Sequence, residues 1–295
     1  MTMNISSDRL ELSPLTGNDY SFIFELVNAP GWLQFIGDRN IRTEDDAKAY
    51  ILKINENPQI KYRKVTLRSG KKPMGIITWV KRDYLEYPDV GFAFLPDGAG
   101  QGYAFEATRA VLYSAPEVLR QDRILAITTR ENVRSVKLLE KLKFSCDGET
   151  EADGKMLLQY SLDQDHLLIG KCIHDFYSIF SNVFREPEFE VINEICSPSS
   201  NIIKKSADGA EVYDLESFIN PWKRILTDGT LTEFSEWETG EETRIVGTIA
   251  QRYSKYCKKG LLNGKYFEAS GHKMFQLMKD HGVWKIVHMA WEDEV

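Results

Sequence analysis

The stretch that decides the fold of the first half of the chain is Leu95-Pro96-Asp97-Gly98-Ala99-Gly100-Gln101-Gly102-Tyr103-Ala104-Phe105-Glu106-Ala107. It places three glycines at alternating positions between a predicted strand (90–95) and a predicted helix (102–114). Such a turn lets backbone N–H groups point into one concavity, and the helix amino terminus adds partial positive charge. Taken alone, the stretch indicates either a pyrophosphate cradle or a flexible connection, because glycine-rich turns are common.

Two familiar phosphate-binding motifs do not match this glycine turn. The Gly-Lys-Ser/Thr ending of a Walker A loop is missing, and the turn follows a fourth or later strand, whereas a dinucleotide fingerprint opens the first strand–helix unit. The order Gly100, Gly102, Tyr103-Ala104, Glu106-Ala107 instead resembles the acetyl-CoA motif of the GNAT acetyltransferase superfamily, in the branch that acetylates ribosomal-protein amino termini. Two further stretches resemble that branch in the same order: Arg9-Leu10-Glu11-Leu12-Ser13-Pro14-Leu15, and Arg130-Glu131-Asn132-Val133-Arg134-Ser135 before a helix ending Lys141-Leu142-Lys143-Phe144.

The resemblance covers about residues 7–160. It implies a mixed α/β sheet, acetyl-CoA as the cofactor and a backbone N–H of Phe94 or Leu95 as the donor to the thioester. Tyr103 can equally belong to the core, and Asn132 is also a suitable N-cap for the following helix. The cofactor-binding positions that the resemblance implies are Phe94, Leu95, Gly98, Gly100, Gln101, Gly102, Tyr103, Ala104, Asn132 and Ser135.

Acetyl transfer to an amine needs a base for the amine and a proton donor, or its equivalent, for the leaving thiolate. By resemblance, Asp89 takes the place of the acidic residue of this branch and is the candidate base, while Ser135 points toward the leaving sulfur. The alternative for Asp89 is a structural cap at the start of a strand, after the polar bend at 83–87. Cys146 has no histidine nearby in the sequence, so a covalent cysteine mechanism is not expected.

Two positions depart from the family pattern. Asp97 stands where the family usually has Arg or Gln, which places a carboxylate near a diphosphate. It repels the cofactor if it points inward, and costs little if it is exposed and screened. Lys143 replaces the glycine of the usual Gly-Phe ending, which alters only a helix C-cap.

The acceptor site is expected between the first two helical patterns, at residues 31–39, where the resembling fold builds its acceptor wall. Trp32, Phe35, Asp38 and Arg39 would form an amphipathic rim there. Equally, Trp32 and Phe35 can close the edge of the core. An amine on a peptide, a small metabolite or an antibiotic would fit, so the acceptor stays open.

Charge and pattern divide the chain near residue 164. Residues 1–164 hold 22 basic and 23 acidic residues, and the remainder holds 15 and 21, so the net charges are −1 and −6. A strand predicted over 156–162 closes the first part, and apolar residues then recur at helical spacing over 167–183. The predicted domains are therefore 1–164, an α/β acetyltransferase fold, and 165–295.

The second domain is predicted to be α+β. After helical patterns, the periodicity becomes two over 243–256, 265–279 and 283–291, which indicates long antiparallel strands. Short stretches at 226–230, 273–276 and 282–286 resemble the NTF2-like (SnoaL-type) superfamily, a cone with a curved antiparallel sheet. That resemblance implies a homodimer, a ligand-binding module, or an isomerase or hydrolase. The polar residues available for a site inside the cone are Tyr253, His272, Gln276 and His288.

Composition limits the class of protein. The 295 residues carry 37 basic and 44 acidic side chains, a net charge of −7, with 42% hydrophobic residues. The four cysteines are far apart, and no apolar run is long enough to cross a bilayer. These features argue against a membrane protein, a zinc site, a disulfide scaffold and a basic nucleic-acid binder, and they predict a cytoplasmic protein.

Three functions remain open on the sequence alone. The leading one is an acetyl-CoA-dependent N-acetyltransferase with a small-molecule or peptide amine as acceptor. The others are a non-catalytic CoA- or ligand-binding protein, and an NTF2-like enzyme with an auxiliary first domain.

Overall fold

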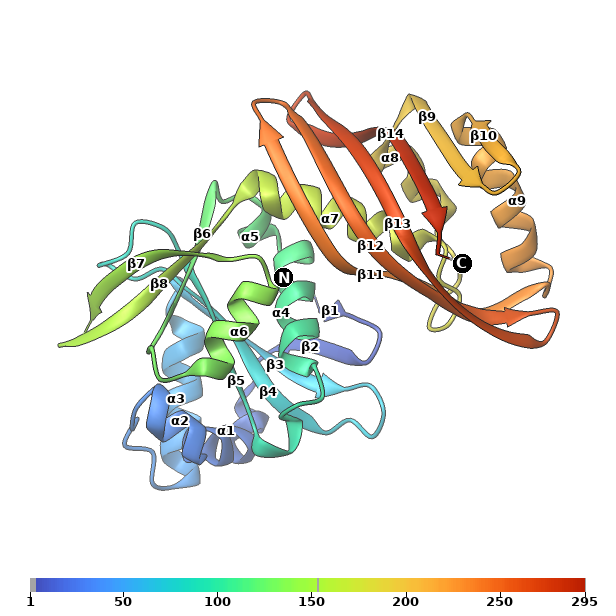
Figure 1. The fold of residues 1–295 in the computed structure, drawn as a ribbon. Helices are drawn as coiled ribbons and strands as arrows, with labels where there is room; N and C mark the ends of the chain where they lie inside the picture. The colour runs from blue at the N-terminus through green and yellow to red at the C-terminus, as the bar shows by residue number, and fades with distance from the viewer. Residues whose placement is uncertain (1–3, 153, 295) are drawn as a thin grey trace. The chain divides into compact units, whose positions relative to one another are not determined.

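The computed structural model describes residues 4–152 and 154–294. The chain divides into two compact units that meet between Leu167 and Leu168, inside helix α7 (Gln164–Ile179). Each unit has its own β-sheet (Figure 1). Each also has its own set of buried hydrophobic residues.

The first unit alternates strands and helices. Its sheet has eight strands in the order β1-β2-β3-β4-β5-β6-β8-β7. The only parallel pair among the described strands of this sheet is β5 with β6. The elements before α7 are β1 (Ile5–Ser6), β2 (Leu10–Pro14), η1 (Gly17–Asp19), α1 (Tyr20–Val27), α2 (Pro30–Phe35), α3 (Glu44–Glu56), β3 (Ile60–Leu67), β4 (Pro73–Val80), β5 (Asp89–Phe94), η2 (Pro96–Gly98), α4 (Tyr103–Ser114), α5 (Pro116–Leu119), β6 (Arg123–Thr128), α6 (Val133–Lys141), β7 (Ser145–Ala152) and β8 (Lys155–Asp163).

Helices cover both faces of this sheet. Apolar residues of α1 and α3, such as Ile23 and Ile51, pack with Ile76 of β4 on one face. Residues of α4 and α6, such as Val111 and Leu139, pack on the other face. This arrangement confirms a mixed α/β fold for the first half of the chain.

The local signals at the helix ends explain where the elements begin. Thr43 caps α3: its side chain accepts a hydrogen bond from the Asp46 N–H at 3.1 Å, and the Asp46 carboxylate accepts from the Thr43 N–H at 2.9 Å. This reciprocal pair of hydrogen bonds is a capping box. Helix α6 ends before Lys143, whose φ of 69° lies in the left-handed region, so a lysine occupies a position that favours glycine.

The second unit is a six-stranded sheet, ordered β10-β9-β14-β13-β12-β11, with helices α7 and α9 packed on one face. Strands β11 to β14 pair antiparallel, as predicted, while β9 and β14 pair in parallel, so the sheet as a whole is mixed. Its elements after α7 are η3 (Phe189–Val191), α8 (Ile192–Ile195), β9 (Cys196–Ser206), β10 (Gly209–Tyr213), α9 (Leu215–Thr227), β11 (Leu231–Val246), β12 (Ile249–Leu262), β13 (Lys265–Asp280) and β14 (Val283–Asp293).

The strands of this unit differ from the sequence pattern at two places. The serine-rich stretch at 197–200 belongs to β9, where the Ser200 hydroxyl donates to the Ile286 carbonyl oxygen at 2.8 Å. The predicted strand over 243–256 is two strands, because the chain turns at Gly247, whose φ is 60°. Alternation continues across such a short turn, so the periodicity did not reveal it.

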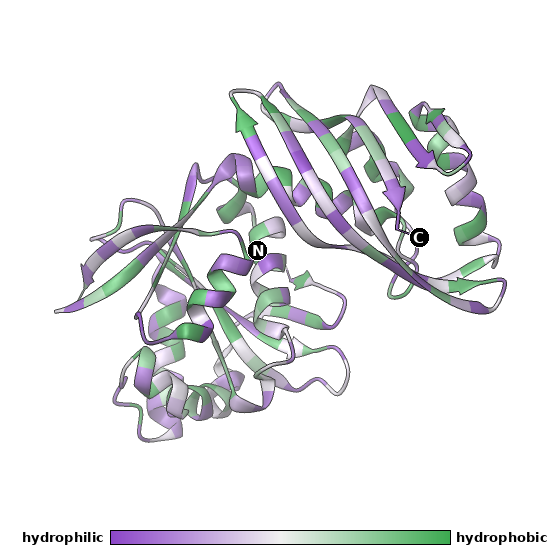
Figure 2. Ribbon diagram, viewed as in Figure 1, coloured by the Kyte–Doolittle hydropathy of each residue, from purple (hydrophilic) through white to green (hydrophobic). Residues whose placement is uncertain are grey.

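The sheet of the second unit has a buried face and an exposed face. Along β11, β12 and β13, hydrophilic and hydrophobic residues alternate (Figure 2). Arg252, Ser254 and Tyr256 lie on the buried face of β12. Tyr253 and Gln276 lie on the opposite face of their strands, as does His272, which pairs with Glu294 at 2.9 Å. Of the four polar residues available for a site inside the predicted cone, Tyr253, His272 and Gln276 therefore do not point into the interior.

Candidate active site

Strands β5 and β6 separate in the middle of the first unit's sheet. They pair only at Asp89 and Leu125, where the Leu125 N–H donates to the Pro88 carbonyl oxygen at 2.9 Å. On its other side β5 pairs with β4 along its whole length, from Asp89 to Phe94. Within the described residues, the β6-facing backbone of β5 from Val90 to Phe94 therefore has no strand partner, and an extended ligand can bind to it.

Of the two predicted backbone donors at the end of β5, only one faces this gap. The Leu95 N–H donates to the Met74 carbonyl oxygen of β4 at 2.8 Å. Because successive N–H groups of a strand point to opposite sides, the Phe94 N–H points away from β4, toward β6. The prediction that the Leu95 N–H could act as the donor is corrected: Phe94 is the donor that the geometry leaves available.

The glycine turn begins with a structural residue. The Gly98 N–H closes the short η2 turn by donating to the Leu95 carbonyl oxygen at 3.0 Å. A Cβ at Gly98 would lie 3.2 Å from the Met74 Cε, a tight contact with the end of a flexible side chain. Because the Gly98 N–H is already used within the turn, it is not a free donor, and the predicted cofactor contact of Gly98 stays a prediction.

The rest of the turn leaves backbone donors at the start of α4. Gly100 and Gly102 have φ values of 76° and 77°, which glycine adopts without strain. Gly102 is the N-cap of α4, and no side chain of the described residues caps the helix there. The first hydrogen bond of α4 runs from the Glu106 N–H to the Gly102 carbonyl oxygen, so the N–H groups of 103–105 have no acceptor within the helix. This end of α4 is suited to an anion.

An ion pair joins Glu106 at the start of α4 to Arg9, directly before β2, and sequence reasoning missed it. Glu106 accepts from the Arg9 N–H at 2.9 Å and lies 2.6 Å from the Arg9 guanidinium, which also donates to the Gln101 carbonyl oxygen at 3.1 Å. The guanidinium carbon lies 4.7 Å from the centre of the Tyr103 ring. Both charged residues belong to stretches that resembled the family, but nothing in the sequence showed that they meet.

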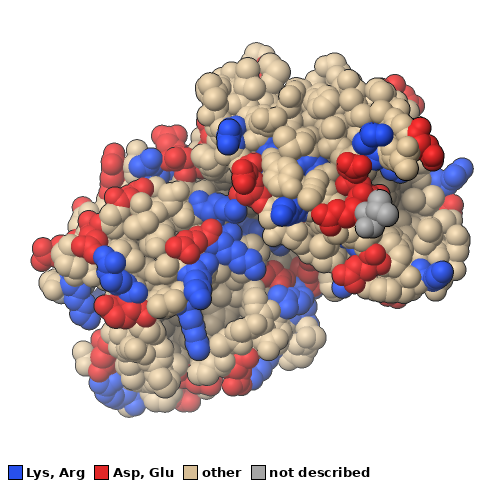
Figure 3. Space-filling model, viewed as in Figure 1, with Lys and Arg blue, Asp and Glu red and all other residues tan. Residues whose placement is uncertain are grey.

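Positive charge gathers beside the same end of α4. Arg109 and Lys141 both lie over the Phe105 ring, at 5.1 and 4.5 Å from its centre. Figure 3 shows Lys and Arg side chains collected over the part of the first unit that holds α4 and α6. These two cations were also missed, because their approach to the turn depends on the packing of two helices.

Asp97, the departure from the family pattern, lies at the surface. Its side chain is 72% exposed and pairs with Lys72 at 2.9 Å. The hydrogen bond from Lys72 lowers the pKa of Asp97, so the carboxylate is ionised but neutralised by its partner. Its repulsion toward an anion is therefore weak.

The polar residues after β6 approach the gap from the other side. The Asn132 side chain caps α6 by accepting from the Ser135 N–H at 3.2 Å, which is the structural role considered for it. The Ser135 side chain is buried, and its hydroxyl has no partner within the described residues. The Thr129 hydroxyl, directly after β6, is likewise buried and meets no hydrogen-bond partner in the described part of the chain. An unsatisfied buried hydroxyl at the carboxyl end of a strand beside the gap suggests a ligand contact that sequence reasoning missed.

Asp89 lies on the face of the sheet covered by α1 and α3 and is only 2% exposed. Its carboxylate accepts two hydrogen bonds from Arg82, at 2.6 and 3.3 Å. Burial raises the pKa of Asp89, and Arg82 opposes this shift. Two tyrosines lie on the same face, with the hydroxyl oxygens of Tyr50 and Tyr62 3.4 Å apart. The pair with Arg82 is compatible with both roles considered for Asp89, the base and a structural cap at the start of β5.

The predicted acceptor rim is only partly at the surface. Trp32 is 4% exposed and donates to the Gly37 carbonyl oxygen at 3.1 Å, so it belongs to the core and its assignment to the rim is corrected. Phe35 is half-buried. Asp38 pairs with Arg42, and Arg39 is exposed with no charged partner within the described residues. Arg39 and Phe35 are thus the members of the rim that can still meet an acceptor.

Neither a metal centre nor a membrane span was found in the parts of the chain that the structure describes. No three His, Cys, Asp or Glu side chains of residues 4–152 and 154–294 gather as a metal site. Over the same residues, the helices are too short or too polar to cross a bilayer.

Comparison with known proteins assigns the first unit. A family model described as "Acetyltransferase (GNAT) domain" matches residues 9–145. The chain is 27% identical over 146 residues to the uncharacterized N-acetyltransferase YnaD of Bacillus subtilis, which covers 50% of this chain and 85% of that protein.

Solved structures were also found for this half of the chain. A GNAT-family acetyltransferase from Bacillus anthracis is 23% identical, with a TM-score of 0.47, and covers 55% of this chain and 99% of that one. Spermidine N-acetyltransferase from Vibrio cholerae, in complex with CoA and spermine, is 18% identical with a TM-score of 0.48, over 55% of this chain and 99% of that one. On the strength of the family model and the curated relative, residues 9–145 are a GNAT acetyltransferase domain and the protein is an acyltransferase.

Proposed function

We propose that the first unit transfers the acetyl group of acetyl-CoA to a primary amine, either of a small molecule or of a peptide amino terminus. One observation carries the proposal. The parallel strands β5 and β6 separate after Asp89, which leaves one edge of β5 unpaired within the described residues. The glycine turn and the uncapped amino-terminal end of α4 follow directly after this edge.

The residues around the gap fit such a cofactor. The uncapped start of α4 suits a diphosphate, and a Cβ placed at Gly100 would meet no atom within 4 Å, so a ligand can approach its backbone. Arg109 and Lys141 supply positive charge nearby. The unpaired edge of β5 offers backbone partners for the amides of the pantetheine arm.

Acetyl-CoA would supply an acetyl group activated as a thioester. In this proposal, the Phe94 N–H donates a hydrogen bond to the carbonyl oxygen, where negative charge develops. Asp89 accepts a proton from the acceptor ammonium, directly or through water, and Arg82 holds its carboxylate in place. The Ser135 hydroxyl donates toward the departing sulfur, and the Thr129 hydroxyl gains the partner that it lacks among the described residues.

Calorimetric titration with acetyl-CoA tests cofactor binding. Micromolar to submillimolar affinity is expected, and an absence of binding at millimolar cofactor contradicts the proposal and favours a non-catalytic protein. A screen of amine acceptors, including polyamines, amino sugars and short peptides, then identifies the class of acceptor by release of free CoA.

Asp89→Asn tests the base. We expect kcat to fall at least a hundredfold, with the acetyl-CoA dissociation constant changed less than threefold, because the side chain lies on the opposite face from α4. Asp163→Asn, which removes an exposed carboxylate paired with Arg123, is the matched control and should retain activity. Unchanged turnover in Asp89→Asn would remove Asp89 as the base.

We further propose that the second unit is NTF2-like and that it dimerises the chain or binds a ligand of its own. The support is its architecture, in which α7 and α9 pack on one face of a long-stranded sheet. Sedimentation velocity tests the dimer: a single species at the monomer mass, 33.9 kDa, across micromolar concentrations excludes it.

A further inference from the structure

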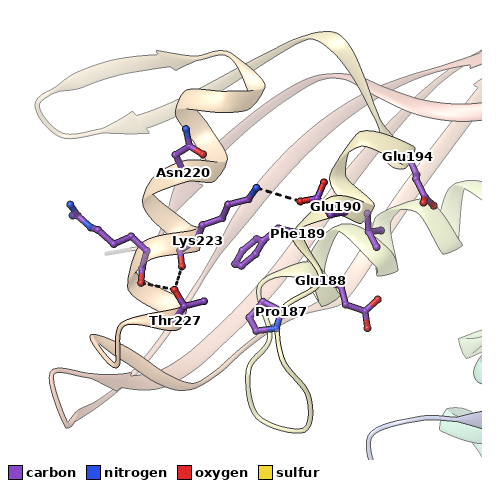
Figure 4. Close-up of a pocket in the computed structure, with 10 residues that line it drawn as sticks. Pro187, Glu188, Phe189, Glu190, Glu194, Asn220, Lys223 and Thr227 are labelled. Carbon is purple, nitrogen blue, oxygen red and sulfur yellow. Dashed lines mark hydrogen bonds and ion pairs between the residues drawn. The ribbon is translucent and has the colours of Figure 1, made fainter.

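An opening alone does not mark a binding site in this protein. The second unit has an open depression of about 970 Å³ between the η3–α8 segment and α9 (Figure 4). Its charged side chains are at the surface: Lys223 lies 3.7 Å from Glu190, and the glutamate side chain is 88% exposed. Among the described residues that line it, no buried polar group fixes the position of a ligand. In the first unit, by contrast, polar groups are held in place around Asp89.

One face of the first unit's sheet is left partly open beside Asp89. This face, which α1 and α3 cover, is fully buried at Ile76 of β4. Two residues along the same strand, Thr78 is only half-buried, as are its strand partners Tyr62 of β3 and Gly91 of β5. These three half-buried residues form the acceptor floor. Because side chains alternate along a strand, Asp89 lies on the same face as the floor, two residues before Gly91.

The acceptor floor presents hydroxyl groups. A Cβ at Gly91 would lie 2.5 Å from the Thr78 hydroxyl oxygen, so a larger residue there would displace this hydroxyl. The Tyr62 hydroxyl lies 3.4 Å from the hydroxyl of Tyr50 on α3, which is also half-buried. Only one of these two tyrosines can donate to the other, so within the described residues one hydroxyl proton of the pair has no acceptor. The floor can therefore donate a hydrogen bond to an anion.

Arg39 is held beside this floor by its neighbours in the chain. The Trp32 ring donates to the Gly37 carbonyl oxygen at 3.1 Å, and the Asn28 amide donates to the Ile41 carbonyl oxygen at 3.2 Å. Ile41 is buried and packs with the apolar residues of α1 and α3. The backbone on both sides of Arg39 is thus fixed against the helices that cover this face, while the arginine itself is exposed.

Two guanidinium groups act on the Tyr62 hydroxyl. Burial and the neighbouring Tyr50 hydroxyl raise the pKa of Tyr62. The charges of Arg39 and Arg82 oppose this shift, so both guanidinium groups lie near that hydroxyl. Arg82 is engaged by Asp89, whose carboxylate accepts its two hydrogen bonds. Arg39 has no carboxylate partner among the described residues, so its positive charge beside the floor is not neutralised.

The neighbouring carboxylates are matched by cations of their own. Lys64, the next residue of β3 on the same face as Tyr62, pairs with Asp19. Arg42 pairs with Asp38, the residue directly before Arg39. Neither pair leaves a carboxylate over for Arg39, so its charge is in surplus. A guanidinium in this state is suited to a carboxylate, which accepts two parallel N–H bonds from it.

We propose that the acceptor is a small amine that also carries a carboxylate, such as a free amino acid, and that Arg39 binds this carboxylate. This assignment rests on the proposed acetyl transfer and adds the class of its acceptor. The amine lies at Asp89, directly or through water, and the carboxylate accepts hydrogen bonds from Arg39 and from a tyrosine hydroxyl. The acceptor nitrogen takes the acetyl carbon from the sulfur of acetyl-CoA. One of the ammonium protons passes to Asp89, and a second passes to the departing sulfur.

Other amines fit this arrangement less well. A polyamine brings further ammonium groups, which the surplus charge of Arg39 repels. A peptide amino terminus has an uncharged amide where an amino acid has its carboxylate, so it offers Arg39 no ion pair. The site should therefore distinguish an amino acid from its own amide.

The standard L-amino acids, their carboxamides and spermidine test the class of acceptor with the full chain and acetyl-CoA. Release of free CoA is measured at neutral pH. At least one amino acid is expected to react with a kcat/KM at least tenfold above that of its own amide. Equal kcat/KM for acid and amide, or a higher value for spermidine than for every amino acid, would overturn the proposal.

Two arginine variants locate the carboxylate. Arg39→Gln should raise KM for the preferred amino acid at least tenfold and change kcat less than threefold, because Arg39 binds the acceptor and takes no part in proton transfer. KM for the matching amide should change less than threefold. The control is Arg120→Gln, at an exposed arginine after α5, whose apolar residues pack on the other face of the sheet; it should leave these values unchanged. An unchanged KM for the amino acid in Arg39→Gln contradicts the assignment.

Failure of this acceptor class is distinguishable from failure of the transferase. If acetyl-CoA binds and other amines are acetylated but no amino acid is, the acceptor class is wrong while the transferase stands. If acetyl-CoA does not bind, the transferase fails, and the acceptor class fails with it.

Discussion

The two units of this protein present polar groups of different kinds. In the first unit, the sheet opens between β5 and β6, and the site consists largely of backbone N–H groups with glycines that expose them. In the second unit, β11 to β14 stay paired over long registers, and the polar groups of the interior are charged side chains such as Lys273 and Glu236.

This difference has an energetic consequence. Backbone N–H groups at the gap between β5 and β6 and at the start of α4 require no buried charge, because water or a ligand accepts their hydrogen bonds. Side-chain charges inside a sheet-and-helix core must be paired, and the loss of one partner leaves the other desolvated. We therefore expect substitutions in the second unit to affect stability and those at the glycine turn to affect binding.

The largest effect is expected for the buried pair of the second unit. Lys273→Met leaves the Glu236 carboxylate buried without its partner and should lower the free energy of unfolding by about 3–5 kcal/mol in urea denaturation. The double variant Glu236→Leu/Lys273→Met should recover most of this loss. In the first unit, Lys72→Met breaks only the exposed pair with Asp97 and should cost less than about 1 kcal/mol. If Lys72→Met and Lys273→Met lowered the free energy of unfolding by similar amounts, the contrast between the two units would not hold.

The next largest difference between the units is expected in how their stability depends on alkaline pH. Burial raises the pKa of Tyr177 and Tyr256 in the second unit and of Tyr62 in the first. Above pH 10 the unfolded chain loses these protons while the folded chain keeps them, so the unfolded state binds fewer protons. The free energy of unfolding then falls as pH rises, by about 1.4 kcal/mol per pH unit for each tyrosine.

Unfolding measured between pH 9 and pH 11.5 checks this dependence. Above pH 10, Tyr177→Phe should make the free energy of unfolding fall less steeply with pH, by the contribution of one tyrosine. Tyr84→Phe, at a residue that is 45% exposed, serves as the control. A slope that Tyr177→Phe leaves unchanged would show that this tyrosine ionises equally in both states.

A smaller, binding-specific effect is expected at the glycine turn. Gly100 and Gly70 share a φ of 76°, and a Cβ at either position meets no atom within 4 Å. Alanine at each should therefore cost a similar free energy of folding, about 1 kcal/mol. Only Gly100→Ala should weaken acetyl-CoA binding, about tenfold by calorimetry. Equal acetyl-CoA affinity in the two variants would exclude the Gly100 backbone from the cofactor site.

The smallest effect is expected for Asp97. Because its carboxylate is exposed and paired with Lys72, Asp97→Asn should change the acetyl-CoA dissociation constant by less than about threefold at physiological salt. A tenfold gain in affinity would show that Asp97 repels the cofactor after all, and that this departure from the family pattern weakens binding.

Most elements of the first unit could be predicted from its sequence, because strands, caps and the glycine turn have local signals. The capping box at Thr43 and the helix after Gly102 are examples. The strand β7 was not predicted, since its residues alternate weakly and most are exposed. In the second unit, period-two patterning indicated strands but not their partners, so the parallel pairing of β9 with β14 was missed.

The candidate site was predictable only where its residues are close in sequence. Gly100 and Gly102 were found because they lie together in one motif. Leu95 was assigned a donor role that strand pairing with β4 rules out. Arg82 was not connected to Asp89, because whether two charged residues at a strand end form a buried pair depends on the packing around them.

The sequence by itself determined the positions at which the backbone can turn left-handed, the faces that must be buried and the family of the first unit, because these depend on residue type and local spacing. Tertiary structure alone decided that β5 and β6 separate, that Arg9 pairs with Glu106, and that Lys273 meets Glu236. The physical reason is that strand register and buried charge pairing are settled by partners distant along the chain, which no local pattern of residues encodes.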